Sequence, residues 1–180
     1  MTISDWIYIS AANATVLLLV VAAVSDLRRY RIPNYLVYAI VAAFAVATAV
    51  HFSWIALAWS AAAGAGMFLL GAGFFALRLF GGGDVKLIAA VALWTGVADL
   101  LRFLFVMSVL GSVLGVIWLV RRRRHQQQIA AVAAASPETP PPPARTFKLP
   151  YGVAIALAGL DFFATSVHSP YAAYLPWPLY

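Results

Sequence analysis

The sequence predicts an all-α, polytopic integral membrane protein with about six transmembrane helices. Of its 180 residues, 64% are hydrophobic and only 10% are charged, which is too apolar for a water-soluble domain. A helix that crosses a bilayer uses about 20 mostly apolar residues, so the chain has room for about six crossings and little else. The sequence has no Cys, which excludes disulfide frameworks, thiol nucleophiles and Cys-built zinc sites.

Six apolar runs carry the expected helices. In chain order they cover residues 6–24, 35–50, 54–80, 85–97, 100–120 and 149–167. The third run is long and interrupted by Gly, so we expect a tilted or broken helix, whereas the fourth is short and is expected to continue toward Leu100. We interpret residues 1–180 as a single transmembrane domain, in which 121–147 is a flexible basic and Pro-rich cytoplasmic connection between helices five and six.

The basic residues predict the orientation of these helices. Eleven of the twelve Lys and Arg residues lie in the first, third and fifth connections, and only Arg102 lies on the other side. Since cytoplasmic loops carry the excess of positive charge, these connections are expected in the cytoplasm and both termini outside, in the cytoplasmic (inner) membrane of the cell. This topology also explains the net charge of +6, so no nucleic-acid partner is expected.

Candidate chemistry rests on the acidic residues, because an ionisable group at membrane depth costs about 2.5 to 3.5 kcal/mol on insertion scales. Asp5, Asp99 and Glu138 lie outside the apolar runs and are expected on the solvated surface. Asp26 ends the first run and Asp84 precedes the fourth, so both are expected at the cytoplasmic face. Asp161 lies about 18 Å into the sixth run. Its alternatives are a functional role or a hydrogen bond to another helix.

The segments around Asp26 and Asp84 can bring the two carboxyl groups together. Pro33 forces a turn after the first helix, and the glycines 81–83 leave space for another backbone beside Asp84. Two carboxyl groups that share one proton can supply both a general base and a general acid for peptide hydrolysis. The alternative is local ion pairing, of Asp26 with Arg28 or Arg29 and of Asp84 with Lys86.

Three motifs resemble those of the type IV prepilin peptidases, which are membrane aspartic proteases with a G-x-G-D-x-K box. They are an Asp followed by basic residues and Ile-Pro-Asn (26–34), Gly-Gly-Gly-Asp-Val-Lys-Leu (81–87), and Lys-Leu-Pro-Tyr-Gly-Val-Ala-Ile-Ala (148–156). The resemblance implies that Asp26 and Asp84 are catalytic, and it places Gly81, Gly83 and Lys86 on the glycines and lysine of the box. For Lys86, tuning of the carboxyl charge and simple anchoring of the helix both remain open.

The resemblance further implies cleavage of the leader peptide of a prepilin-like or pseudopilin substrate, at the cytoplasmic membrane face, while the substrate's transmembrane stem stays in the bilayer. Long family members add a Cys-rich zinc-binding segment and N-methylate the new terminus. This chain has no Cys, so we expect a peptidase without N-methyltransferase activity, similar to the short form of Flp or Tad-type pilus assembly, with no cofactor and no metal. The alternative function is a small proton-coupled transporter, or a membrane factor of pilus or secretion assembly.

Overall fold

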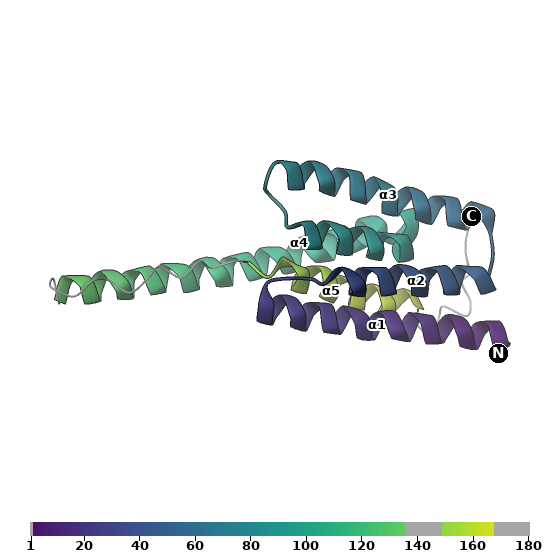
Figure 1. Ribbon diagram of the computed structural model, residues 1–180, viewed down its shortest axis with the longest axis horizontal. Coiled ribbons are helices and arrows are strands. Elements are labelled where there is room, and N and C mark those ends of the chain that lie inside the picture. Colours follow the sequence, from purple (N-terminus) through teal and green to yellow (C-terminus); the bar gives the residue numbers. More distant parts are fainter. Residues whose placement is uncertain (1, 136–148, 168–180) are drawn as a thin grey trace.

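The computed structural model describes residues 2–135 and 149–167, which form helices joined by short connections (Figure 1). The helices are α1 (Ile3–Arg29), α2 (Asn34–Val50), α3 (Trp54–Ala76), α4 (Gly82–Ala135) and α5 (Tyr151–Phe162), and a π-helical turn (Phe163–Val167) follows α5. The all-α prediction is therefore confirmed.

Side-chain caps fix where two of the helices begin. The Thr2 hydroxyl accepts a hydrogen bond from the Asp5 N–H, and the Asp5 carboxylate accepts one from the Thr2 N–H, which together start α1. Ser53 accepts a hydrogen bond from the Ala56 N–H at the start of α3. Both caps satisfy backbone donors that the first helical turn leaves unpaired.

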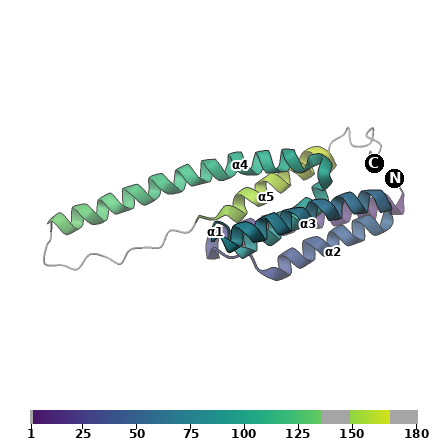
Figure 2. The same ribbon diagram turned by 90° about the horizontal axis from the view of Figure 1, so that it is seen from above.

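Gly96 divides α4 into two parts. Its φ of 55° and ψ of −167° are not helical, and the chain reverses its direction there (Figures 1 and 2). The apolar runs 85–97 and 100–120 therefore form one element with a sharp bend. The second part of α4 runs back along the bundle and continues beyond it as a helical arm to Ala135. Residues 121–135 of the connection expected between helices five and six are helical, and 136–148 lie outside the described residues.

The core of the bundle is built from apolar side chains of α1, α2, α4 and α5. Its fully buried members include Leu19, Ile40, Leu87, Phe103 and Ile155. Many large apolar side chains instead point outward, which suits a hydrocarbon environment and would be unfavourable in water. Examples are Leu69, Leu101 and Phe105, each at least 70% exposed.

Helix α3 packs against α4 through glycines. Within the third apolar run, Trp54–Ala76 forms one unbroken helix, contrary to the alternative of a break, and two of its glycines lie in close contact with α4. A Cβ atom on Gly64 would lie 2.6 Å from Leu93 Cδ2, and one on Gly71 would lie 2.7 Å from Val85 Cγ1. Small residues at such positions allow membrane helices to pack closely.

Within the described ranges, three helices are long and apolar enough to cross a membrane: α1, α3 and residues Gly82–Ala131 of α4. The apolar helices α2 and Tyr151–Ser166 are shorter. The described residues thus support a protein with several membrane-spanning helices, but they do not show six crossings, since α4 joins two predicted runs in one element and two other runs form shorter helices.

Candidate active site

Asp26 lies in the last turn of α1, and the backbone after it turns sharply. The N–H of Tyr30 donates to the Asp26 carbonyl oxygen at 2.8 Å, and Tyr30 adopts a left-handed conformation with φ of 51°. The Ser25 hydroxyl donates to the Arg31 carbonyl oxygen at 2.9 Å. These two bonds fold the segment 30–33 back over Asp26, whose side chain is only 5% exposed.

Asp84 lies in the first turn of α4, three residues after Gly81. Its carboxyl group accepts a hydrogen bond from the Gly81 N–H, the position from which an acid commonly caps its own helix. A Cβ atom on Gly81 would lie 2.8 Å from Asp84 Oδ2, so a side chain at position 81 would crowd the carboxyl group. Asp84 is half-buried.

The end of α1 and the start of α4 lie at the same end of the bundle, which we call the Asp26–Asp84 end (Figure 1). There the Asp26 carboxyl group acts electrostatically on that of Asp84. Neither carboxyl group forms an ion pair among the described residues, where the two pairs found are His51–Asp5 and Arg102–Asp161. The local pairs considered for Asp26 and Asp84 are therefore not formed.

Gly83 allows the turn that follows Asp26 to approach the start of α4, which carries Asp84. A Cβ atom on Gly83 would lie 3.2 Å from Ile32 Cβ and 3.6 Å from the Ile32 backbone nitrogen and oxygen. The turn that follows Asp26 is therefore packed directly onto the first turn of α4. Neither Gly81 nor Gly83 has a positive φ, so glycine is needed at these positions for its lack of a side chain and not for an unusual backbone conformation.

Lys86 bonds to Asn34, and no ion pair of Lys86 with either acid occurs among the described residues. Its Nζ donates a hydrogen bond to Asn34 Oδ1 at 3.0 Å, which ties the start of α4 to the start of α2. This contact favours a positioning role for Lys86 over tuning of the carboxyl charge.

The start of α5 adds residues that reasoning from the sequence alone did not assign to the site. A Cβ atom on Gly152 would lie 2.8 Å from Asp26 Oδ2 and 2.7 Å from Ile32 Cδ1. Tyr151 stacks on Phe80 with ring centroids 5.4 Å apart, and its hydroxyl group is within electrostatic reach of Asp84. The Pro-Tyr-Gly motif was visible in the sequence, but only the packing of α5 against α1 shows what it contacts.

The two carboxyl groups interact electrostatically in a partly buried setting, and neither is paired with a cation among the described residues. Two carboxyl groups that share one proton can both accept a proton from water and donate one to a carbonyl oxygen. No group of three His, Cys, Asp or Glu residues that could hold a metal ion occurs in the described parts of the chain.

Asp161 is held away from this pair. Its Oδ2 accepts a hydrogen bond from Arg102 Nη2 at 3.1 Å, which corresponds to the structural alternative considered for it. Along α5 it lies roughly 13 Å beyond Gly152.

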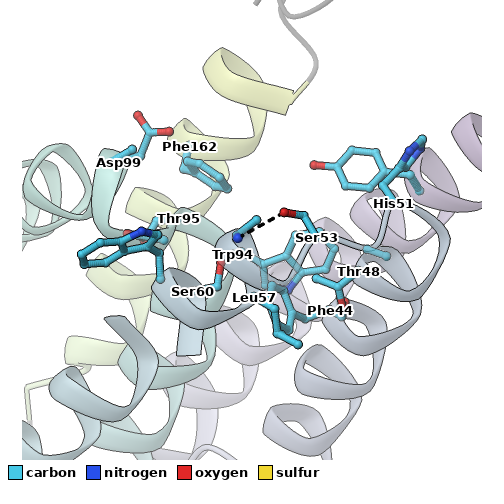
Figure 3. Close-up of a pocket in the computed structure, with 16 residues that line it drawn as sticks. Phe44, Thr48, His51, Ser53, Leu57, Ser60, Trp94, Thr95, Asp99 and Phe162 are labelled. Atoms are coloured by element: carbon cyan, nitrogen blue, oxygen red, sulfur yellow. Dashed lines mark hydrogen bonds between the residues drawn. The ribbon is translucent and has the colours of Figure 1, made fainter. Parts of the chain in front are cut away.

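A cavity of about 90 Å³ opens at the opposite end of the bundle, near Gly96 (Figure 3). Aromatic rings line it, among them those of Phe44 and Trp94. Two of its hydroxyl groups bond to nearby backbone: Thr48 donates to the Phe44 carbonyl oxygen, and Ser53 accepts from the Ala56 N–H. These polar groups are already satisfied, so this cavity offers less chemistry than the Asp26–Asp84 end.

Comparison with known proteins identifies a family for the chain. The sequence model of the type IV leader peptidase family matches residues 14–116, a range that includes Asp26 and Asp84 and excludes Asp161. No curated protein and no solved structure matches the chain. The family match confirms the resemblance seen in the sequence motifs.

Proposed function

Since the chain belongs to the type IV leader peptidase family and is an aspartic prepilin peptidase, we propose that Asp26 and Asp84 are its catalytic pair. The observation that carries this assignment is their meeting at one end of the bundle with no cation paired to either. Gly81 and Gly83 give the pair space, and Lys86 fixes the start of α4 through Asn34.

The proposed reaction needs only the two carboxyl groups, which share one proton, and a water molecule. The ionised carboxyl takes a proton from the water molecule, and the water oxygen bonds to the carbonyl carbon of the scissile peptide. At the same time the protonated carboxyl gives its proton to the carbonyl oxygen of that peptide. The C–N bond then breaks, and the leaving nitrogen takes up the proton that the first carboxyl had accepted. As the intermediate's hydroxyl group becomes the carbonyl of the new acid, its proton returns to the second carboxyl. The products are a carboxylic acid and an amine, and the pair again holds one proton.

We place this chemistry at the cytoplasmic face of the inner membrane, with six crossings and both termini outside. The exposed Arg28, Arg29 and Arg31 follow Asp26, Arg78 precedes Asp84, and residues 121–124 lie on the arm that extends past the same end. An excess of basic residues marks a cytoplasmic side. Substrates in this arrangement are Flp-type prepilins or pseudopilins, whose transmembrane stem stays in the bilayer while the leader reaches the aspartates.

The test is cleavage of a prepilin-like peptide, leader and stem together, by the purified chain in lipid nanodiscs. We expect a single cut after the leader, located by mass spectrometry. Asp26→Asn and Asp84→Asn should each lower the rate by at least about 100-fold, because each removes a proton acceptor or donor. Asp161→Asn is the control and should retain cleavage. Normal cleavage by either of the first two variants, at wild-type protein level, contradicts the assignment.

A further inference from the structure

The Asp26 carboxyl group is packed against the first turn of α5. A Cβ atom at position 152 would lie 2.8 Å from Asp26 Oδ2 and 3.0 Å from its Cγ, closer than side-chain atoms normally approach. Glycine at position 152 is what permits the contact.

The N-terminus of α5 has no side-chain cap of its own. Pro150 is its N-cap residue and makes no capping hydrogen bond. The backbone N–H groups of Gly152 and Val153 approach the Asp26 carboxyl group instead. These amides, together with the partial positive charge of a helix N-terminus, favour a negative charge beside them.

Asp26 is also the aspartate that most needs such partners. Asp26 is only 5% exposed to solvent. Its Oδ2 atom is buried and forms no hydrogen bond of standard geometry with the described residues. An ionised carboxylate in this position would be costly without the dipoles of α5. Asp84 is more exposed and receives a single amide, that of Gly81, from its own helix. Among the described titratable groups, Asp84 from α4 interacts electrostatically with Asp26, and Tyr151 from α5 interacts with Asp84.

We propose that the N-terminus of α5 holds Asp26 as the ionised member of the pair, so that Asp26 is the base toward water, Asp84 is the acid toward the scissile carbonyl, and Gly152 is the positioning residue that permits this contact. This inference rests on the proposed function. It divides the roles that the proximity of the two carboxyl groups leaves equivalent.

The experiment compares the pH profile of kcat/KM for peptide cleavage in wild type, Gly152→Ala and Gly159→Ala. The two variants add the same methyl group to the same helix on its α1 side, but position 159 faces Leu19, with Cδ1 at 2.9 Å, and not a carboxyl group. In Gly152→Ala the carboxylate is pushed from the amides, so the acid limb of the profile should move up by about one pH unit. Gly159→Ala should leave the limb in place.

The added methyl group in Gly152→Ala also meets Ile32, so a second variant separates the two contacts. Ile32→Val removes the Cδ1 atom that lies 2.7 Å from the new Cβ atom. The double variant Gly152→Ala/Ile32→Val should keep the shifted limb. An unshifted limb in Gly152→Ala, equal shifts in both glycine variants, or restoration of the limb by Ile32→Val overturns the proposal.

Amide hydrogen exchange at the start of α5 gives a readout that does not depend on cleavage. Asp26→Ala should speed exchange at Gly152 and Val153 by about tenfold or more, whereas Asp84→Ala should not. Equal exchange in the two variants contradicts the contact. If the wild-type chain cleaves nothing, the proposed function fails; if it cleaves and the limb does not move, only this inference fails.

Discussion

Ile32 is the residue through which the two halves of the site touch. Its Cβ atom packs against Gly83 at the start of α4, and its Cδ1 atom packs against Gly152 at the start of α5. The Ser25 hydroxyl donates a hydrogen bond to the neighbouring Arg31 carbonyl oxygen, which helps to hold the loop that carries Ile32. The position of Asp26 relative to Asp84 therefore depends on residues that carry no charge.

Gly83→Ala tests this dependence. The new Cβ atom would lie 3.2 Å from Ile32 Cβ, a contact that requires the loop or the start of α4 to shift. Because a displacement of about 1 Å can cost 100-fold in rate, we expect a drop in kcat of about 10-fold to 100-fold in the peptide assay.

Gly73→Ala is the matched control for that variant, since nothing lies within 4 Å of a Cβ atom there. It should cleave at the wild-type rate. Equal activity of Gly83→Ala and Gly73→Ala would contradict the role given to the Ile32 contact.

For single residues, the sequence predicted which aspartates and glycines belong to the candidate site but not which residues they contact. The cost of a charge at membrane depth and the spacing of the G-x-G-D box are local properties of the chain, so Asp26, Asp84, Gly81 and Gly83 could be selected from them. The contacts of Gly152 arise between segments more than 100 residues apart, and no local pattern encodes them.

Among the elements, α4 determines where the remainder of the bundle lies. Its first part carries Asp84 and much of the core, and its second part returns along the bundle to the same end. The reversal depends on Gly96, whose φ of 55° with ψ of −167° belongs to a region that only glycine adopts readily.

Gly96→Ala should therefore lower the free energy of unfolding by about 1 to 3 kcal/mol. Gly115→Ala, in the helical second part of α4 and with open space around its Cβ position, should raise it by about 0.5 to 1 kcal/mol, because alanine favours a helix. Thermal unfolding in detergent measures both changes. A Gly96→Ala variant as stable as Gly115→Ala would show that the bend does not require glycine.

The sequence predicted most of the helices but did not predict how the fourth and fifth apolar runs are joined. Runs of apolar residues located α1, α2, α3 and α5 to within a few residues, since each is bounded by polar or turn residues. Periodicity could not show that Gly96 bends the chain without a loop, nor that the helix continues through 121–124 to Ala135.

For the whole molecule, composition indicates a membrane environment, and the distribution of basic residues is the basis of the proposed orientation. The outward apolar side chains and three long apolar helices suit a bilayer. The number of crossings could not be read from the sequence with the same certainty, because α2 and α5 are shorter than a full crossing and α4 joins two runs.

Orientation can be tested with single cysteines, since the chain contains none. Tyr30→Cys and Leu79→Cys should react with a membrane-impermeant thiol reagent only from the cytoplasmic side. Phe52→Cys and Ala98→Cys should react from outside, because they lie in the connections that carry few basic residues. Labelling of all four from one side, or the reverse pattern, contradicts the proposed topology.

The most direct test of the central claim is whether positions 26 and 84 meet in the membrane. The cysteine-free chain allows the double variant Asp26→Cys/Asp84→Cys to be treated in membranes with the shortest bifunctional thiol reagent, and mass spectrometry then detects the internal bridge. We expect efficient bridging, and none in the control variant Asp26→Cys/Asp161→Cys, whose second cysteine lies farther along α5. Bridging of the control pair but not of positions 26 and 84 would contradict the account.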